Sequence, residues 1–313
     1  MITLGGVNQI SRYYGGKAFD PAFLELAQEH FLLWMVREGL FANGPEDVVF
    51  KGGTALRKFR LALRGRFSTD LDFAIARAEY AEHVLLSLDE GFEIEGVSFS
   101  APRGAIDWGA LKARWIATNE LATSVEAKLD FSQRATLLPP EIPTSRAAIP
   151  GVARDFLGFD PPLVPLMALP ENLAEKLARF RRLIFSRDLY DLWKLGPLAR
   201  DQLDLIRTIV GFKVYFDIIE EGQAGARPFR GGVEFQARRA DEVVDPDDLG
   251  LVIGEPASIP DMLATVHGVF GAMGAPSGAV DERVARIDPT DAYWVRQQYE
   301  RLRQEFRAAT AAG

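Results

Sequence analysis

The stretch "DLDFAIA", residues 70–76, alternates acidic and apolar side chains at the period of a β-strand. Asp70 and Asp72 share one face of that strand, and apolar side chains share the other. The two aspartates lie about 6–7 Å apart at their Cα atoms, and like charges repel unless a cation lies between them. Aspartate is depleted in strands, so a pair of them is expected to lower stability. Its presence therefore suggests that the pair serves a function. The pattern predicts a strand that carries a cation site; the alternative is a solvated strand face.

A second stretch, "SVEAKLDFS" at residues 124–132, alternates in the same way and places Glu126 and Asp130 on its polar face. If this strand pairs beside the first, the carboxylate of Asp130 joins Asp70 and Asp72, and Glu126 is the rival on the same face. Hard divalent cations prefer carboxylate oxygens. Three acids around two metal ions would serve an in-line displacement at phosphorus.

The sequence "DVVFKGGTALRKF" predicts a short buried strand, a glycine turn and a helix in succession. Gly52 and Gly53 allow close approach of the backbone. The helix that starts near Thr54 offers free N–H groups and its positive end, which together make a phosphate-binding site. The Walker A pattern is absent, and the alternative is an ordinary strand–helix turn with Thr54 as the N-cap.

The composition excludes several other classes of protein. The chain of 313 residues has no cysteine, which rules out disulfides, thiolate metal sites and a cysteine nucleophile. The three histidines, His30, His83 and His267, are far apart in the sequence, which disfavours a histidine-based catalytic triad. There is neither a run of eighteen apolar residues nor a basic start followed by an apolar block. We therefore expect a cytoplasmic protein without a membrane span.

Charge is distributed unevenly along the chain. The net charge of −8 disfavours a protein that coats a nucleic-acid duplex. Residues 51–68, however, hold six basic side chains and no acidic one, whereas residues 241–248 hold five acidic side chains and no basic one. A basic segment in an acidic protein predicts a local pocket for a small polyanion such as a nucleotide, or for one end of an RNA.

Periodicity predicts an α/β first half and a mainly helical second half. In the first half we expect helices at 21–38 and 78–89 and a further strand at 92–100. Prolines between residues 138 and 165 indicate a long connection, followed by one last strand at 163–169. Residues 230–260 look irregular, and the other parts of the second half have helical patterns at 171–185, 186–195, 202–219 and 291–309.

The second half contains one further group of charged residues. Lys176 lies beside the apolar stripe of a helix, where an ammonium is unfavourable unless it meets a partner or reaches water. Asp188 and Asp191, three residues apart on the next helix, are able to hold it. Adjacent helical positions point about 100° apart, so it is open which of three arginines faces this group: Arg179, Arg181 or Arg182. The alternative is a solvated, charged helix hairpin.

The joint order of these features, G-G-T, D-x-D, a later strand aspartate and then E-K-L … R-D-x-x-D, resembles the nucleotidyltransferase superfamily. Within it, "FKGGTALRK…RFSTDLDF" together with "AEKLARFRR…SRDLYDLW" resembles the AbiEii family, the abortive-infection or type IV toxin nucleotidyltransferases. The resemblance spans residues 21–195. It implies an α/β (α+β) fold, with a nucleotidyltransferase-like mixed-sheet core at residues 1–165. A mainly helical C-terminal domain at 166–313 would close over the nucleotide.

The resemblance also implies roles for single residues. Asp70 and Asp72 match the metal-binding pair, and Asp130 matches the third acid. The nucleotide-binding glycines and hydroxyl are matched by Gly52, Gly53 and Thr54. Lys176 matches the lysine that contacts the nucleotide, and the second family motif is matched by Arg187, Asp188 and Asp191.

The reaction implied by the resemblance is transfer of a nucleoside monophosphate from an NTP to an acceptor hydroxyl, with Mg²⁺ or Mn²⁺ as the cofactor. It also implies an RNA acceptor, such as the end of a tRNA, and a separately encoded antitoxin, in a toxin–antitoxin pair that serves phage defence. One alternative is a nucleotidyltransferase that acts on a small molecule or a protein side chain, which the negative net charge favours. Another is a non-catalytic NTP-binding module, against which the presence of every expected site residue argues.

Overall fold

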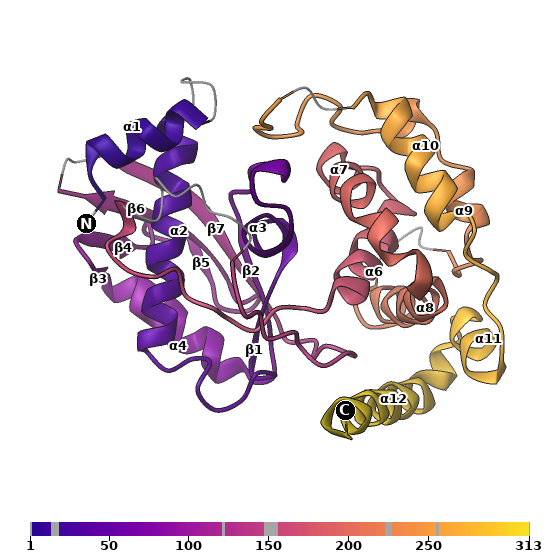
Figure 1. Cartoon of the computed structure of the whole chain (residues 1–313). Coiled ribbons are helices and arrows are strands. Elements are labelled where there is room, and N and C mark those ends of the chain that lie inside the picture. Colours follow the sequence, from indigo (N-terminus) through magenta and orange to yellow (C-terminus); the bar gives the residue numbers. More distant parts are fainter. Residues whose placement is uncertain are drawn as a thin grey trace. The chain divides into compact units, whose positions relative to one another are not determined.

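The computed structural model of the chain describes residues 2–13, 19–120, 123–146, 156–222, 227–254 and 257–312. The chain forms two compact units, each with its own set of buried apolar side chains. The first unit contains Met1–Ala135, Pro140–Met167 and Leu251–Gly254, and the second contains Thr136–Pro139, Ala168–Gly250 and Glu255–Gly313. In Figure 1 most of the first unit is indigo to magenta, and most of the second is rose to yellow.

The first unit is built on a mixed β-sheet. Among the described residues this sheet has seven strands in the order β1-β2-β7-β6-β4-β3, with β5 paired to β6. β2 and β7 are parallel, and the other neighbouring pairs are antiparallel. The strands are β1 (Val48–Lys51), β2 (Leu71–Ile75), β3 (Phe92–Ile94), β4 (Val97–Ser100), β5 (Ile106–Asp107), β6 (Lys112–Asn119) and β7 (Ser124–Ser132).

One face of the sheet forms the core of this unit. Alternate residues of β6 and β7 are buried, and the residues between them are exposed or half-buried on the opposite face. Helices α2 (Phe19–Arg37) and α4 (Ala78–Glu90) cover the apolar face, and α1 (Leu4–Tyr13) packs on α2 (Figure 1). Phe31 of α2 contacts Phe99 and Trp115 with ring centroids 5.5 Å apart, and burial of such a side chain contributes about 1.5–3 kcal/mol. The polar side chains of β6 and β7 are therefore left for other uses.

Two expectations for the first unit are wrong. Residues 92–100 do not form one strand, because Glu95 and Gly96 take positive φ angles of 49° and 74° and turn the chain between β3 and β4. Residues 163–169 do not form a last strand: Leu166 makes isolated bridges to Phe50 and Glu141, and Pro165 has no N–H to give to a ladder. The sequence patterns also did not indicate α1, β5 or β6.

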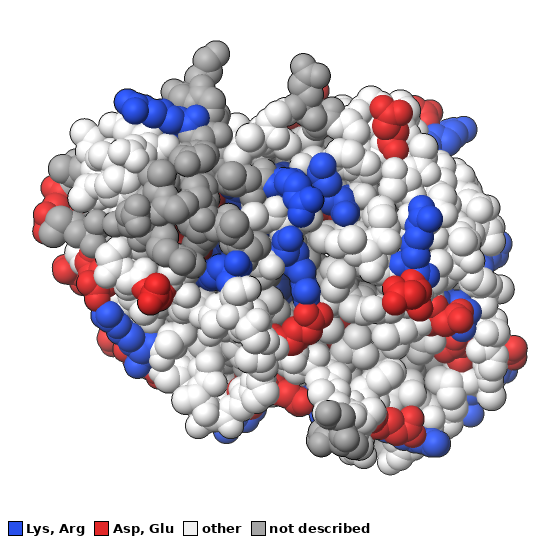
Figure 2. Space-filling model, in the orientation of Figure 1, with Lys and Arg blue, Asp and Glu red and all other residues white. Residues whose placement is uncertain are grey.

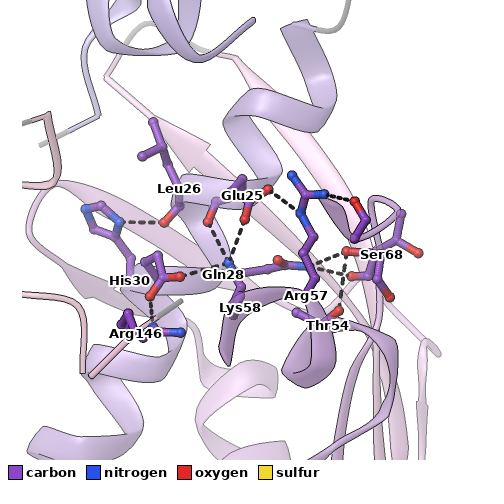
Figure 3. A network of polar contacts seen from close by, with 12 residues as sticks. Glu25, Leu26, Gln28, His30, Thr54, Arg57, Lys58, Ser68 and Arg146 are labelled. Carbon is purple, nitrogen blue, oxygen red and sulfur yellow. Dashed lines mark hydrogen bonds and ion pairs between the residues drawn. The ribbon is translucent and has the colours of Figure 1, made fainter. Parts of the chain in front are cut away.

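A buried ionic network joins α2 to the segment after the glycine turn (Figure 3). There, α3 (Gly52–Leu56) runs into a π-helical turn, Arg57–Leu61. Arg57 Nε lies 3.0 Å from Glu25 Oε2, and Lys58 Nζ lies 2.9 Å from Glu29 Oε1. Arg146 also pairs with Glu29. The expected polyanion pocket is therefore wrong for this part of residues 51–68, because these cations are buried and paired inside the protein.

The second unit is mainly helical. Its helices are α6 (Leu169–Phe180), α7 (Ser186–Leu195), α8 (Leu203–Ile219), α9 (Val233–Gln236), α10 (Ile259–Phe270), α11 (Ala279–Ala285) and α12 (Ala292–Ala312). Helices α7, α8 and α12 agree with the expected ones. The helix expected at 171–185 ends earlier, at Phe180, and the segment 230–260 contains the short α9. No helix in the described part of the chain is long and apolar enough to cross a membrane.

We expect Glu29→Ala to destabilise the protein strongly. The side chains of Lys58 and Arg146 are 1% and 2% exposed, and removal of their shared carboxylate leaves buried positive charge with too little compensation. Loss of one partner of a buried ion pair lowers the free energy of unfolding by about 3–5 kcal/mol. Urea denaturation followed by circular dichroism measures this change.

The matched control is Glu95→Gln, which breaks the exposed pair with Arg37, where the side chains are 37% and 54% exposed. Exposed pairs contribute little to the free energy of unfolding. Equal effects of the two substitutions would contradict a structural role for the buried network.

Candidate active site

The register of the sheet brings Asp72 and Asp130 together. In the parallel pair of β2 and β7, Asp72 is directly opposite Asp130, so both carboxylates leave the same face of strands that lie about 4.8 Å apart. Asp70 directly precedes β2, and Asp70, Asp72 and Asp130 are all half-buried. The carboxylate of Asp70 accepts a hydrogen bond of 2.8 Å from the Thr69 hydroxyl. The expected gathering of three aspartates on one face is therefore present.

The same register separates Glu126 from this group. Glu126 lies opposite Ile116 of β6, and its carboxylate binds Arg114 at 3.2 Å. The strand position beside Asp72 belongs to Asp130. Of the two acids that the sequence left open, the structure thus puts Asp130 next to the aspartate pair.

Lys112 is a member of this group that the sequence patterns did not indicate. It lies opposite Asp130 in the antiparallel pair of β6 and β7, and its Nζ is 2.7 Å from Asp130 Oδ2. The hydrogen bond to Asp130, together with the nearby charges of Asp72 and Asp107, raises the pKa of the Lys112 ammonium. Lys112 is therefore charged and holds the Asp130 carboxylate. The alternation of "KARW" at residues 112–115 could have indicated a strand with Lys112 on its polar face, but not its pairing with Asp130.

A hollow of about 200 Å³ opens on this face of the sheet. Its charged lining residues are of both signs, and they comprise Asp70, Asp72, Asp107, Asp130, Lys112, Arg114 and Lys128. The acids of the site thus lie at the wall of a concave surface that a ligand can enter. Acidic and basic groups side by side suit a ligand that carries phosphate as well as a cation.

The aspartates do not form a ready-made metal centre. Among the residues that the structure describes, no group of three Asp, Glu, His or Cys side chains is arranged to hold a metal ion. Asp70 and Asp72 nevertheless fit the donor set that Mg²⁺ uses, one or two carboxylates completed by waters and substrate phosphates. A Cβ at Gly52 would overlap the carboxylate of Asp72. The absence of a side chain at this position therefore allows the Asp72 carboxylate to lie there.

The two glycines bring the start of α3 against the acids. Gly52 has a φ of +77°, a conformation that favours glycine. A Cβ at Gly53 would overlap the Arg66 guanidinium and lie 2.9 Å from Ser68 Oγ. The first N–H groups of a helix have no partner within the helix, so this turn presents donors close to Asp72. Glycine at both positions is explained by geometry in the structure.

The hydroxyl of Thr54 is used inside the protein. It donates a hydrogen bond of 2.5 Å to the carbonyl oxygen of Asp70, and the carbonyl oxygen of Ser68 lies 3.3 Å away. Thr54 is fully buried. From α2, Gln28 Nε2 donates to the carbonyl oxygens of Ser68 and Thr69, both at 3.0 Å (Figure 3). Two buried side chains therefore fix the three successive carbonyl groups that lead into β2. A contact of Thr54 with phosphate would involve its N–H rather than its hydroxyl.

The second unit holds a separate cluster of buried charges. Lys176 Nζ lies 3.2 Å from Asp188 Oδ1 and 2.8 Å from Asp191 Oδ2, and all three side chains are at most 5% exposed. Arg179 also binds Asp188 with two hydrogen bonds, of 2.5 and 2.6 Å. The ion pairs that the sequence allowed for Lys176 are thus present, and Lys176 is held between two helices rather than solvated.

The structure also assigns the arginines of this region. Arg179 is the one that joins the Lys176 cluster, whereas Arg181 pairs with Glu234 at 2.9 Å and Arg182 with Asp217 at 3.6 Å. The guanidinium groups of Arg179 and Arg187 lie 5.7 and 5.4 Å from the ring centroid of Phe185. Of the residues expected to bind nucleotide, Arg187, Asp188 and Asp191 therefore lie on one helix, α7, of the second unit.

The histidines take no part in either cluster. His30 is buried in α2, where burial lowers its pKa to about 4 and its Nδ1 contacts the Leu26 carbonyl oxygen at 2.8 Å. His83 lies on the surface of α4 beside Glu38, and His267 lies on α10.

Comparisons with known proteins support the fold class expected from the sequence. Residues 37–242 match the family model described as nucleotidyl transferase AbiEii toxin, type IV TA system. Among solved structures, the chain is similar to MenT4, a nucleotidyltransferase toxin from Mycobacterium tuberculosis H37Rv, at 29% identity and a TM-score of 0.80. That likeness covers 96% of this chain and 98% of the other. No curated protein sequence matches the chain.

We expect Gln28→Met to impair nucleotidyl transfer in a protein that still folds. Methionine keeps the apolar part of the side chain but removes both donors to the carbonyl groups of Ser68 and Thr69. Unsatisfied buried carbonyls lower stability by about 1–3 kcal/mol, and a displaced Asp70 would reduce kcat by about tenfold or more. Steady-state kinetics and urea denaturation measure the two effects.

The control is Gln236→Met in the second unit, where the lost donor serves the Gly271 carbonyl oxygen at 3.1 Å. It should leave kcat within about twofold, because no site residue depends on that bond. An unchanged kcat in Gln28→Met would show that Gln28 does not position the site.

We expect Lys176→Ala to destabilise the second unit, since it leaves Asp191 and Asp188 buried with less positive charge. The loss should be about 3–5 kcal/mol, as for other broken buried pairs. The double variant Lys176→Ala/Asp191→Asn should recover part of that loss, because it removes one of the buried negative charges. Thermal unfolding of the three proteins would decide: a stability equal to the wild type in Lys176→Ala would mean that the ion pairs contribute nothing to the fold.

Proposed function

Because the chain belongs to the AbiEii family of nucleotidyl transferase toxins of type IV toxin–antitoxin systems, we propose that it transfers a nucleoside monophosphate from an NTP to a hydroxyl group of an RNA, such as the end of a tRNA. The observation that carries this proposal is the parallel register of Asp72 and Asp130 beside the glycine turn. A phosphate-binding turn and a carboxylate pair on adjacent strands are the parts that phosphoryl transfer needs.

The aspartates would share the work at the reacting phosphate. Asp70 and Asp72 would hold Mg²⁺ or Mn²⁺, which neutralises charge on the phosphate oxygens and polarises them. The oxygen of the acceptor hydroxyl forms a bond to the α-phosphorus, the bond to the β-phosphate oxygen breaks, and pyrophosphate leaves with that electron pair. Asp130 would accept the proton of the hydroxyl. Lys112 would orient the Asp130 carboxylate through their ion pair.

The triphosphate would be bound by groups that donate hydrogen bonds. The N–H groups of Gly53 and Thr54 at the start of α3 suit phosphate oxygens. The family motif assigns Lys176 and the α7 residues Arg187, Asp188 and Asp191 to the nucleotide as well, and we carry this assignment over as part of the proposal. Catalysis would then consist mostly of positioning and charge neutralisation.

The choice of an RNA acceptor and a separately encoded antitoxin rests on the family. Its type IV toxin–antitoxin description implies a cognate antitoxin. On the face that Figure 2 shows, acidic as well as basic side chains are exposed, and the net charge of the chain is −8. Such a surface suits recognition of one end of an RNA better than binding along a duplex.

The test of this function is incubation of the protein with each labelled NTP, Mg²⁺ and total RNA. The wild type should label a discrete RNA species and release pyrophosphate. Asp72→Asn keeps the size of the side chain and removes its charge, so it should lower transfer by about a thousandfold or more while the protein stays folded. Label on a small molecule or on the protein itself would contradict the RNA acceptor, and full activity of Asp72→Asn would contradict the site. In bacteria, expression of the wild type should slow growth, and Asp72→Asn should relieve this effect.

A further inference from the structure

The polar face of the sheet carries charges that the proposed roles do not explain. The register aligns Lys51, Asp72, Asp130 and Lys112 in one row across β1, β2, β7 and β6. In the next row, Lys128 of β7 lies directly opposite Arg114 of β6. Like charges opposite one another on one face of an antiparallel pair are destabilising. The fold itself thus gains nothing from this pair of cations.

Lys128 differs from its basic neighbours in having no acidic partner. Lys112 binds Asp130 and Arg114 binds Glu126. Within the described part of the chain, the exposed side chain of Lys128 makes neither an ion pair nor a hydrogen bond. All three basic residues line the same hollow as Asp70, Asp72 and Asp130. An exposed ammonium at the wall of a hollow, without an ion-pair partner of its own, is available to bind an anionic group such as a phosphate.

The strand order separates this position from the glycine turn. Gly52 and Gly53 follow β1, on one side of Asp72 in the order β1-β2-β7-β6, whereas Lys128 shares β7 with Asp130 and Arg114 lies on β6, on the other side of Asp72. In an in-line displacement, the entering and the leaving oxygen lie on opposite sides of phosphorus. If the triphosphate lies at the glycine turn, the acceptor approaches from the side of β6.

We propose that Lys128 and Arg114 form an acceptor subsite that binds the phosphodiester next to the reacting hydroxyl of an RNA end. This inference rests on the proposed function and adds to it the surface that the acceptor uses. Lys128 and Asp130 are two residues apart on one strand face, about 6–7 Å at Cα, which is comparable to one nucleotide unit. An RNA whose terminal hydroxyl meets Asp130 therefore has its nearest phosphate within reach of the Lys128 ammonium.

The experiment compares Lys128→Gln with Arg12→Gln in the full-length protein. Arg12 is an exposed basic residue near the end of α1, which packs on the opposite, helical face of the sheet. Binding of unfractionated, fluorescently labelled bacterial tRNA is measured by polarisation at several salt concentrations. Binding of an NTP with Mg²⁺ is measured by calorimetry without RNA. Transfer by the wild type is assayed separately.

Lys128→Gln should raise the Kd for tRNA about fivefold and lower the salt slope by about one, as expected for loss of one phosphate contact. It should leave NTP binding unchanged, and Arg12→Gln should change neither. Equal tRNA affinity and salt slope in the two variants would overturn the subsite. A loss confined to NTP binding would overturn it as well, because the hollow would then hold the donor. Absence of transfer by the wild type would count against the proposed function, while the tRNA comparison would still decide on the subsite.

Discussion

Repulsion between the carboxylates of Asp72 and Asp130 is the constraint on which the first unit depends. Parallel pairing of β2 and β7 fixes the two acids side by side on one face, where only positive charge can offset their interaction. The chain places a lysine at each end of the row: Lys51 lies opposite Asp72, and Lys112 binds Asp130. The stability of the unit comes from the other face, where the same strands bury their apolar residues against α2 and α4.

Helix α2 contributes both to the hydrophobic core and to the positioning of the site. Phe31 and its apolar neighbours complete the core, while Glu25, Gln28 and Glu29 bind the segments that lead into the site. Buried ion pairs add little net stability compared with apolar residues of the same size. Their value here is geometric, because they hold the π-helical turn after α3 in one place. The site residues thus depend on side chains that never touch a ligand.

Features set by residues close together in the sequence could be predicted, whereas features set by contacts between distant residues could not. β7 could be predicted residue by residue, because one buried face imposes a period of two on nine residues. The glycine at position 52 could be predicted from the local turn, which requires a positive φ, whereas its close approach to Asp72 could not. The role of Lys112 could not be predicted, because it depends on the register between two strands. The basic run at residues 51–68 was misinterpreted for a related reason: Arg57 and Lys58 meet acids of α2 that no local pattern reveals.

The interleaving of the two units has a consequence for dissecting the chain. Leu251–Gly254 belongs to the first unit although it follows most of the second in sequence. Within it, the carbonyl oxygen of Leu251 accepts a hydrogen bond of 2.6 Å from the N–H of Phe67, one residue before the carbonyls that Thr54 and Gln28 hold. A fragment ending at Met167 would keep Asp70, Asp72 and Asp130 and still lack this tether on the loop before β2. Covalent continuity with the helical half is therefore part of what shapes the unit that carries these aspartates.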